Sequence, residues 1–316
     1  MTAVVVGAGV AGATAALALR KACASEVVLY ERTQDAATHL GWVTLGPTAM
    51  TALDTIGVAE AVAAVGFPVE EVVFISGDER SVLPRREPGH QYSSTHVWRR
   101  DLLSILRERL DGAIRFEPAP PVDDLVGAPD VDLIVGADGA HSLVRRYLGD
   151  LRPLDHVGES IVYGHSSAVA HQSLSHSVLY FWNYPAGVCG CVSDPRDGTF
   201  WFCRYGDTST HAAPASRWRE LAASAPFVGL VDNSELFGPF ALWELPPTGP
   251  WIGAKTVLIG DAAHALSPAA GRGATSAIED GAILARCLAA ATDTNDGLTR
   301  FVELRRPRAL HSFRRT

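Results

Sequence analysis

Apolar and polar positions follow two different periods along the chain, and the first segments predict a parallel β-α-β unit. The run from Ala3 to Val6 is apolar throughout, as in a buried strand. An Ala/Leu-rich stretch then continues to about Cys23 and has the length of a helix. A second apolar run covers Val27 to Tyr30 and ends in Glu31. Strand, helix and strand therefore follow one another in the first thirty residues.

The pattern changes in the middle of the chain. Three aromatic-rich runs are separated by Pro-Ala-Gly and Asp-Gly, which is typical of an antiparallel sheet; they cover Ser177–Asn183, Val188–Ser193 and Thr199–Tyr205. "VEEVVFISGDERSVLP", residues 69–84, reads as a hairpin. Apolar strands followed by helices return at "DLIVGADGAHSLVRRYL" and "TVLIGDAAHALSPAAGRGATSAIEDG". We therefore expect an α/β (α+β) fold in which a Rossmann-like domain carries an inserted antiparallel sheet.

Composition narrows the class of protein. The chain has 316 residues, 47% hydrophobic content and a formal net charge of -8, which argue for a globular protein and against a nucleic-acid surface. The N-terminal apolar run lacks the features of a signal peptide or a membrane span, so we expect a cytoplasmic protein without a membrane span. Five scattered cysteines without paired CxxC spacing indicate neither a disulfide framework nor a metal site.

The glycines of the first segment point to a dinucleotide. Gly7, Gly9 and Gly12 have GxGxxG spacing. Gly7 permits a tight turn, Gly9 lets a diphosphate approach the backbone, and Gly12 lets helix and strand pack closely. The free N–H groups at the start of the helix favour an anion. Glu31 lies nineteen residues after Gly12, where a carboxylate accepts hydrogen bonds from a ribose 2'-OH, so we expect FAD or NAD rather than NADP.

Two further glycine-containing segments follow apolar strands. Asp138 and Gly139 come directly after the strand of the middle segment, at the sheet edge where ligands bind in open α/β folds. A helix cap is the alternative interpretation of Asp138. Gly260 and Asp261 occupy the same position in the third segment, before a loop that leads into a long helix. The N-terminus of that helix would stabilise the negative charge of a reduced flavin by about 0.3 to 1 kcal/mol, and by ~2 when partly buried.

The ordered set "GAGVAG", "VGADGAHSLVRR" and "IGDAAHALSPAAGRGATSAIED" resembles the flavoprotein aromatic hydroxylases, single-component FAD monooxygenases with the para-hydroxybenzoate hydroxylase fold, over nearly the whole chain. The resemblance implies an FAD-binding domain formed by residues 1–67, 93–155 and 251–316, and a substrate-binding sheet domain formed by 68–92 and 156–250. It also implies a set of FAD-binding residues: Gly7, Gly9, Gly12, Glu31, Arg32, Arg99, Asp138, Gly139, Gly260, Asp261, Pro268, Gly271, Arg272, Gly273 and Ala274.

The same resemblance implies the reaction. NADPH or NADH would reduce FAD, O2 would form a C4a-hydroperoxyflavin, and the distal oxygen would hydroxylate or epoxidise a small aromatic, polycyclic or unsaturated substrate. Pro268 and Gly271 would lie at the reactive edge of the flavin and are the expected catalytic positions. His264, in the same loop, is expected to make a structural hydrogen bond. Members often carry an arginine shortly after the second strand, where this chain reads "DAATHLGW", and most continue beyond the helix that contains "RRPR".

The aromatic sheet supplies the candidate substrate contacts, which are Tyr180, Trp182, Phe200, Phe202 and Arg204. Strand alternation puts the last three on one face, and sheet packing is the alternative role of each aromatic side chain. Three other functions stay open: an FAD-binding protein without turnover, a halogenase, and a reductase of the same fold. A halogenase would need a tunnel lysine and a Trp-x-Trp-x-Ile-Pro segment, and the sequence has neither. The oligomeric state, including a homo-oligomer, also stays open.

Overall fold

The β-α-β unit expected at the N-terminus is present in the computed structural model, which describes residues 1–34, 41–84, 91–169, 174–207, 215–267 and 271–313. β1 (Thr2–Val6) pairs in parallel with β2 (Glu26–Tyr30), and α1 (Val10–Ala22) connects them. The apolar run of β1 is buried at its centre, where Ala3 and Val5 have no exposed surface. A continuous apolar run is what a strand covered on both faces requires.

The chain divides into two compact units. Unit 1 comprises Met1–Val65, Val97–Asp155 and Trp243–Thr316. Unit 2 comprises Gly66–His96 and His156–Leu242. Each unit is therefore discontinuous in sequence, and the assignment of FAD to one and substrate to the other stays a prediction.

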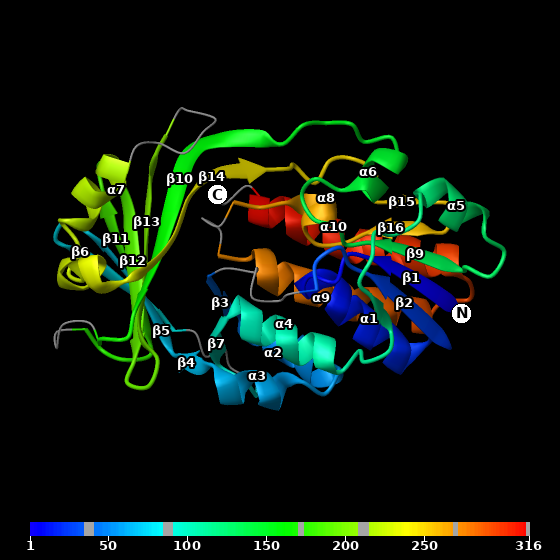
Figure 1. Cartoon of the computed structure of the whole chain (residues 1–316), viewed down its shortest axis with the longest axis horizontal. Helices are drawn as coiled ribbons and strands as arrows, with labels where there is room; N and C mark the ends of the chain where they lie inside the picture. The colour runs from blue at the N-terminus through cyan, green and yellow to red at the C-terminus, as the bar shows by residue number, and fades with distance from the viewer. Residues whose placement is uncertain (35–40, 85–90, 170–173, 208–214, 268–270, 314–316) are drawn as a thin grey trace. The chain divides into compact units, whose positions relative to one another are not determined.

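Unit 1 is built on a largely parallel sheet with the order β15-β16-β9-β1-β2-β8 among the described residues (Figure 1). Its further strands are β3 (Trp42–Leu45), β8 (Ile114–Arg115), β9 (Leu133–Gly136), β15 (Ile252–Gly253) and β16 (Thr256–Leu258). Its further helices are α2 (Pro47–Thr55), α3 (Ala59–Val65), α4 (Arg99–Glu108), α5 (Val122–Gly127), α6 (Leu143–Tyr147), α8 (Asp261–His264), α9 (Gly273–Ala289) and α10 (Thr294–Phe313).

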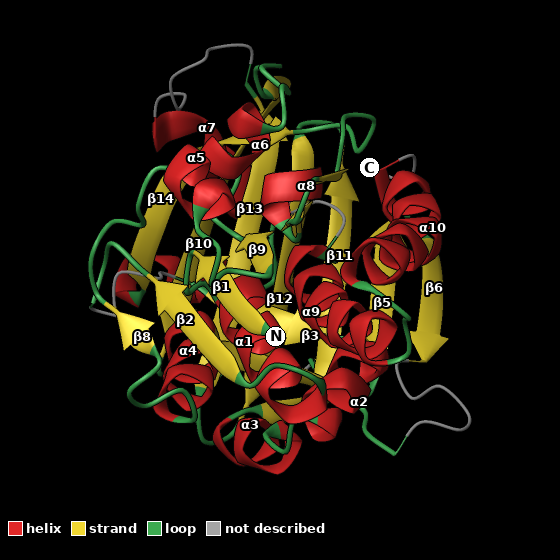
Figure 2. Ribbon diagram, turned by 90° about the vertical axis from the view of Figure 1, so that its right-hand side faces the viewer, coloured by secondary structure: helices red, strands yellow, loops and turns green. Residues whose placement is uncertain are grey.

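Helices cover both faces of the unit 1 sheet (Figures 1 and 2). On one face, Leu125 of α5 packs with Val4 of β1 and Ile134 of β9. On the other face, α1 packs closely on α9, and a Cβ added to Gly281 would lie 2.7 Å from the backbone nitrogen of Ala15. The absence of a side chain at Gly281 thus allows the two helices to approach, and this contact places the start of α9 beside the glycine loop.

Unit 2 is built on a sheet with the order β14-β10-β13-β12-β11-β5-β6 among the described residues. The strands of this sheet are β5 (Glu71–Ser76), β6 (Glu79–Pro84), β10 (Asp155–Ser166), β11 (Val178–Tyr184), β12 (Gly187–Asp194), β13 (Gly198–Gly206) and β14 (Glu235–Glu244). β4 (Phe67–Val69) lies outside it and pairs antiparallel with β7 (Ser94–Trp98), which leads from unit 2 into unit 1. α7 (Ala215–Ala222) and the 3-10 helix η2 (Val228–Asn233) complete unit 2.

The three aromatic strands and the hairpin of unit 2 are where the sequence pattern predicts them. β11, β12 and β13 pair antiparallel, and β5 pairs antiparallel with β6. One pair departs from the expected antiparallel sheet, because β5 runs parallel to β11. β5 enters the sheet from a separate chain segment, so no short turn forces the two strands to run in opposite directions.

Candidate flavin site and substrate face

The three glycine-containing segments meet at the carboxyl edge of the unit 1 sheet. A Cβ added to Gly7, whose φ is +99°, would overlap the carbonyl group of Ala137 at the end of β9. A Cβ added to Gly260, whose φ is +58°, would lie 2.9 Å from the Cβ of Ala11 in α1. Glycine is required at both positions by conformation and by space. Backbone hydrogen bonds also join the segments, from Ala137 to Val6 at 2.8 Å and from Ile259 to Gly136 at 3.0 Å.

The glycine loop leaves the start of α1 open. Gly9 is the N-cap residue, no side chain caps the helix, and a Cβ added to Gly9 would meet no atom within 4 Å. The first backbone N–H groups of a helix have no partner within the helix and attract negative charge. Gly12, by contrast, faces the carbonyl oxygen of Gly7 so closely that no side chain fits. The loop thus combines an open approach to free N–H groups with a tightly packed support.

Glu31 lies beside this loop at the end of β2. Its Oε2 accepts a hydrogen bond from the backbone N–H of Ala8 at 2.8 Å, and its Oε1 accepts one from Thr33 at 2.9 Å. The guanidinium of Arg107 lies 3.5 Å from Oε2. Arg32, the neighbouring candidate, is exposed. The carboxylate is thus held at the glycine loop, and Arg107 is a residue that the sequence analysis did not identify.

Asp138 has a structural role in the middle segment. Its carboxylate accepts hydrogen bonds from the Ser142 hydroxyl and from the backbone N–H groups of Leu143 at 2.7 Å and Val144 at 3.3 Å. These N–H groups belong to the first turn of α6, whose N-cap residue is Ser142; Asp138 supports this cap, so the alternative interpretation of a helix cap describes the segment. Gly139 follows with a φ of +81° and open space around it. A contact of either residue with FAD stays a prediction.

Asp261 opens α8 directly after Gly260. The residue is exposed, but the protein atoms packed around its carboxylate raise its pKa, an effect that the charges of His264 and Arg99 oppose. Arg99, the first residue of α4, is itself exposed. The structure therefore brings Asp261 and Arg99, two of the residues predicted to bind FAD, within electrostatic reach of one another.

A buried ionic network holds the loop that contains Asp261. Asp280 of α9 accepts hydrogen bonds from the backbone N–H of Gly260 at 2.8 Å and from Arg305 Nε at 2.6 Å, and its Oδ2 lies 2.7 Å from Nε2 of His264. Burial alone would raise the pKa of Asp280, but the positive charges of His264 and Arg305 lower it to about 2. Burial likewise opposes protonation of His264, yet Asp280 raises its pKa overall. His264 thus makes the structural hydrogen bond expected of it.

The start of α9 contains the other predicted flavin contacts. Arg272 is the N-cap residue, and no side chain caps this helix either. Gly271 has a φ of +58°, and added Cβ atoms on Gly271 and Gly273 would meet no atom of a described residue within 4 Å. Ala274 belongs to the first turn. Pro268, predicted at the flavin's reactive edge, lies outside the described residues.

The substrate candidates of unit 2 occupy two opposite faces of one sheet. Tyr180 pairs with Cys191, and Cys191 pairs with Trp201, so these three side chains share a face. We call this the tryptophan face; it consists of Tyr180, Trp182, Cys189, Cys191, Trp201, Cys203 and Tyr205. Helix α7 covers this face, and the residues of the face pack with Trp218 and Leu221 of α7 and with Phe227. Tyr180 and Trp182, each 6% exposed, are therefore core residues of unit 2.

The remaining candidates lie on the other side of the sheet. Phe181 pairs with Gly190, Gly190 with Phe202, and Phe202 with Tyr163. We call this the phenylalanine face; it consists of Phe181, Phe200, Phe202, Tyr163, His165 and Arg204. The five candidates therefore cannot line a pocket on one face of the sheet, because β13 points Phe200, Phe202 and Arg204 away from Tyr180 and Trp182.

Side chains of the phenylalanine face contact one another and are partly open. The rings of Phe181 and Phe202 lie 5.6 Å apart in an edge-to-face arrangement. Phe200 is buried, with the ring of His165 at 4.6 Å. Arg204 Nε lies 3.6 Å from Glu159 Oε2, and its side chain is 20% exposed. The face thus presents aromatic surface next to a paired guanidinium.

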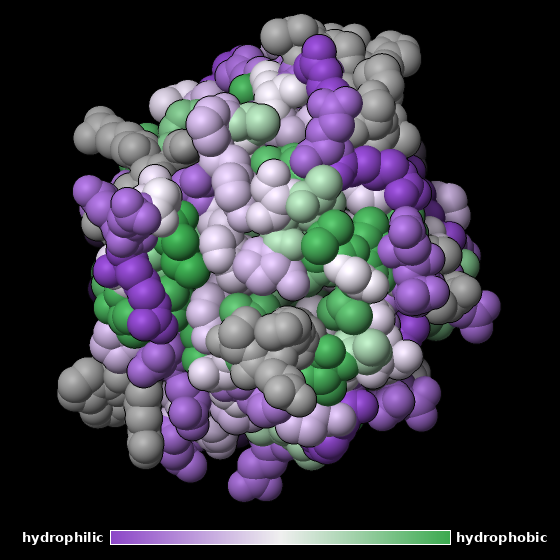
Figure 3. Space-filling model, turned by 90° about the vertical axis from the view of Figure 1, so that its left-hand side faces the viewer, coloured by the Kyte–Doolittle hydropathy of each residue, from purple (hydrophilic) through white to green (hydrophobic). Residues whose placement is uncertain are grey.

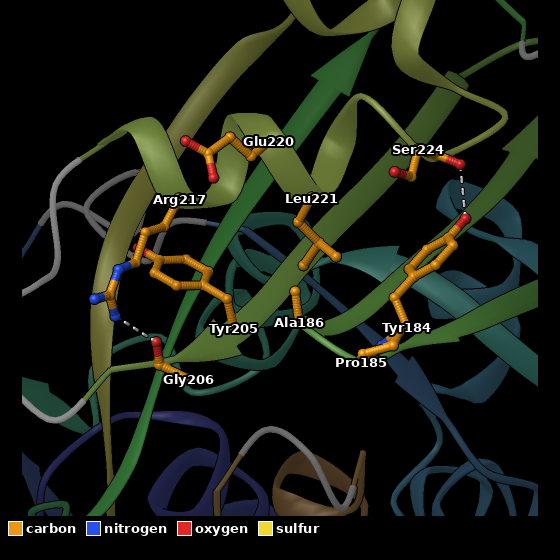
Figure 4. A pocket seen from close by; sticks show the side chains of 9 residues that line it. All are labelled: Tyr184, Pro185, Ala186, Tyr205, Gly206, Arg217, Glu220, Leu221 and Ser224. Atoms are coloured by element: carbon orange, nitrogen blue, oxygen red, sulfur yellow. Dashed lines mark hydrogen bonds between the residues drawn. The ribbon is translucent and has the colours of Figure 1, made fainter.

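An open hollow of about 500 Å³ occurs beside α7 (Figure 4). Tyr184 and Tyr205 flank it, the Tyr184 hydroxyl donates to the Ser224 carbonyl at 2.8 Å, and Arg217 donates to the Gly206 carbonyl at 3.2 Å. Figure 3 shows polar side chains around smaller apolar groups on the side of unit 2 that carries α7. The hollow belongs to the tryptophan side of the sheet, so it is separate from the phenylalanine face.

The FAD-binding domain family model matches residues 1–113 and 130–316. The chain belongs to this family of FAD-dependent aromatic monooxygenases. It is 30% identical to 3-amino-4-hydroxybenzoate 2-monooxygenase PtnB3 of Streptomyces platensis, over 99% of this chain and 86% of that protein. It is 27% identical to aurachin C monooxygenase/isomerase of Stigmatella aurantiaca, over 98% and 86% of the two chains. The protein is therefore an FAD-dependent oxidoreductase.

Solved structures show the same fold. The R204Q variant of HpxO from Klebsiella pneumoniae, complexed with FAD, has a TM-score of 0.82 at 18% identity and covers 100% of this chain and 88% of its own. pqsL of Pseudomonas aeruginosa, described as a probable FAD-dependent monooxygenase, has a TM-score of 0.76 at 18% identity, with 99% and 94% covered. The para-hydroxybenzoate hydroxylase fold predicted from the sequence is confirmed.

The residues of the flavoprotein's unit 1 fit FAD on structural grounds. Gly9 and Gly273 leave open approaches to two helix N-termini, at α1 and α9. Glu31 brings a hydrogen-bond acceptor to the first of them, and Asp261 brings a carboxylate to the segment before the second. An anionic dinucleotide with ribose and ribityl hydroxyls needs these types of group.

Two absences are limited to the described part of the flavoprotein. Within it, no helix is long and apolar enough to cross a membrane. Among the same residues, no cluster of three or more His, Cys, Asp or Glu side chains has the arrangement of a metal site.

Proposed function

We propose that the protein uses NADH or NADPH and O2 to insert one oxygen atom into a small aromatic, polycyclic or unsaturated substrate that binds at the phenylalanine face of unit 2. FAD, when bound, supplies the redox chemistry that activates O2. The remaining tasks fall to side chains of this chain: orienting the substrate, excluding water and balancing charge.

The phenylalanine face carries this proposal. Within unit 2, α7 covers the tryptophan face, while none of the described helices of unit 2 covers the other side of the sheet. The partly exposed rings of Phe181 and Phe202 offer edges and faces against which a flat ring packs. Two relatives are named for substrates with a flat aromatic ring, namely 3-amino-4-hydroxybenzoate and kynurenine.

Arg204 and Glu159 give the face a polar end. Their ion pair is partly exposed, with 20% of the Arg204 side chain and 32% of the Glu159 side chain accessible, and its 3.6 Å separation is long, so a substrate can compete for either partner. A carboxylate or phenolate substituent would bind Arg204, and a ring amine would bind Glu159. We therefore propose that Arg204 fixes the orientation of an anionic substituent while the aromatic rings hold the ring plane.

An anaerobic spectrum tests the reductant, and labelled oxygen tests the reaction. Purified protein should show the flavin absorption near ~450 nm expected of bound FAD, and NADH or NADPH should bleach it. Aerobic turnover with 18O2 and a panel of phenols, aminobenzoates and quinolones should give a product heavier by one labelled oxygen atom. Bleaching with no labelled product from any of the panel would favour a reductase, and a yellow protein that neither nicotinamide reduces would favour FAD binding without turnover.

A further inference from the structure

The last turn of α4 carries a buried arginine outside the set of residues predicted to bind FAD. The side chain of Arg107 is 8% exposed. Its Nε donates to the carbonyl of Ala8 at 3.0 Å, and its Nη1 donates to the carbonyls of Thr33 at 3.4 Å and Gln34 at 3.2 Å. One guanidinium therefore connects the glycine loop to the segment that follows β2.

The remaining nitrogen of this guanidinium, Nη2, has an ion pair but no hydrogen bond among the described residues. Nη2 of Arg107 is buried and makes no hydrogen bond with any described residue, although Oε2 of Glu31 lies 3.5 Å away. Burial lowers the pKa of Arg107, and the charge of Glu31 opposes that shift. A buried guanidinium donor without an acceptor is costly, so such a group calls for a ligand or a structural explanation.

Arg107 connects the glycine loop to the segment after β2, and these two segments are predicted to hold the ADP half of FAD. Ala8 lies between Gly7 and Gly9 of the loop, and its N–H is bonded to Glu31, the predicted ribose ligand. We propose that Arg107 is a cofactor-binding residue, whose Nη2 donates to an acceptor atom of the adenosine half of FAD. Nε and Nη1 meanwhile hold the glycine loop and the segment after β2 at a fixed separation.

Affinity for FAD, measured on apoprotein, tests the assignment without use of activity. Titration of wild type, R107K and R107M is followed by quenching of flavin fluorescence. R107M should weaken FAD binding about 10- to 100-fold, the range expected for loss of a hydrogen bond to a charged group. R107K keeps the charge but loses the planar fork, so its affinity should fall between the other two.

Arg109 offers a matched control two residues further along. It is exposed, and it donates to the carbonyl of Gly57 at 3.3 Å rather than to the glycine loop. R109M should bind FAD within about twofold of wild type, as expected for an exposed contact. Circular dichroism and thermal melting of each apoprotein show whether a variant is folded before its affinity is compared.

Competition with ADP locates the contact within FAD. If Arg107 binds the adenosine half, R107M should weaken ADP and FAD by the same factor. A folded R107M or R107K that binds FAD as wild type does would overturn the proposal. So would a variant that loses affinity for FAD but keeps that for ADP, because the contact would then lie outside the adenosine half. Failure of wild type to bind FAD would instead contradict the family assignment.

Discussion

Units 1 and 2 position their functional groups by different physical means. In unit 1 the segments around the predicted FAD site pack closely on one another at glycines. A side chain at Gly7, Gly12 or Gly260 would overlap a neighbouring segment. In unit 2 the contacts involve side chains, and aromatic rings of the sheet pack at 4.6 to 6.5 Å between centroids. A backbone site tolerates few sequences, whereas an aromatic face tolerates many. This difference agrees with the predicted assignment of the cofactor to unit 1 and of the substrate to unit 2.

The two units also differ in how far their ion pairs are buried. Unit 1 buries Asp280 between His264 and Arg305, and the whole network is almost inaccessible to solvent. On the phenylalanine face of unit 2, Arg204 and Glu159 form a pair that is partly exposed. Buried pairs are strongly destabilising when one partner is removed, while exposed pairs contribute little. Mutations of charge should thus affect folding in unit 1 and ligand preference in unit 2.

The largest effect is expected from the glycine loop. G12V places a branched side chain against the Gly7 carbonyl. Because the two groups cannot occupy the same space, the glycine loop must move away from α1. FAD affinity should fall by more than about 100-fold, judged by the ratio of flavin to protein absorbance after gel filtration. G127A is the control, because Gly127 has open space around it at the end of α5. A yellow G12V protein would contradict the backbone-based account of unit 1.

Removal of the charge of Asp280 is expected to cost the next largest amount. D280N leaves Arg305 and His264 without their carboxylate and should lower the free energy of unfolding by about 3–5 kcal/mol. E279Q is the matched control: Glu279 also pairs with Arg305, at 2.6 Å, but its side chain is 15% exposed and it has no bond to Gly260 or His264 among the described residues, so E279Q should cost less than D280N. Urea unfolding measures both. Equal losses would show that pairing with Arg305, rather than the hold on the loop, carries the energy.

The two faces of the unit 2 sheet should separate stability from substrate binding. W182A removes a core side chain under α7 and should destabilise the protein by about 3–5 kcal/mol while the KM of folded enzyme changes little. F202A, on the partly open face, should cost less stability and raise the KM for substrate several-fold. Thermal melting and steady-state kinetics give the two readouts. If W182A changes KM and F202A does not, the proposed substrate face is the wrong one.

Glycine spacing made much of unit 1 predictable from the sequence. The order of apolar runs and the positions of Gly7, Gly9 and Gly12 predict the β-α-β unit directly, because these constraints act within a few residues. Arg107 was not predictable, since its acceptor Ala8 lies 99 residues away and an arginine in a helical pattern reads as a solvated position. The same is true of Asp280 and Arg305, which are 25 residues apart on different helices.

Strand register limited the prediction in unit 2. Alternation within β13 correctly places Phe200, Phe202 and Arg204 on one face. It gives no information on which residues of β11 share that face, because this depends on pairing through β12. The observed register joins Tyr180 to Cys191 and Cys191 to Trp201, which separates Tyr180 from Phe200. The covering helix α7 lies later in the chain and then decides which face is core.

Dependence of stability on pH gives the finest test of the buried network. The pKa of Asp280 falls from 3.8 in the unfolded chain to about 2, so its contribution of about 2 kcal/mol is present above pH 4 and is lost as the pH falls towards 2. The pKa of His264 is raised above 6.5, so its contribution is complete below that pH and is lost as the pH rises through the folded value. Asp261, Arg305 and Asp280 are the charged groups that act on this histidine. Urea unfolding between pH 2 and 9 should therefore show a loss on the alkaline side that H264Q removes, and an acid loss that H264Q makes smaller, because the charge of His264 also lowers the pKa of Asp280. An unchanged alkaline arm in H264Q would mean that His264 is neutral in the folded protein, and that Arg305 alone balances Asp280.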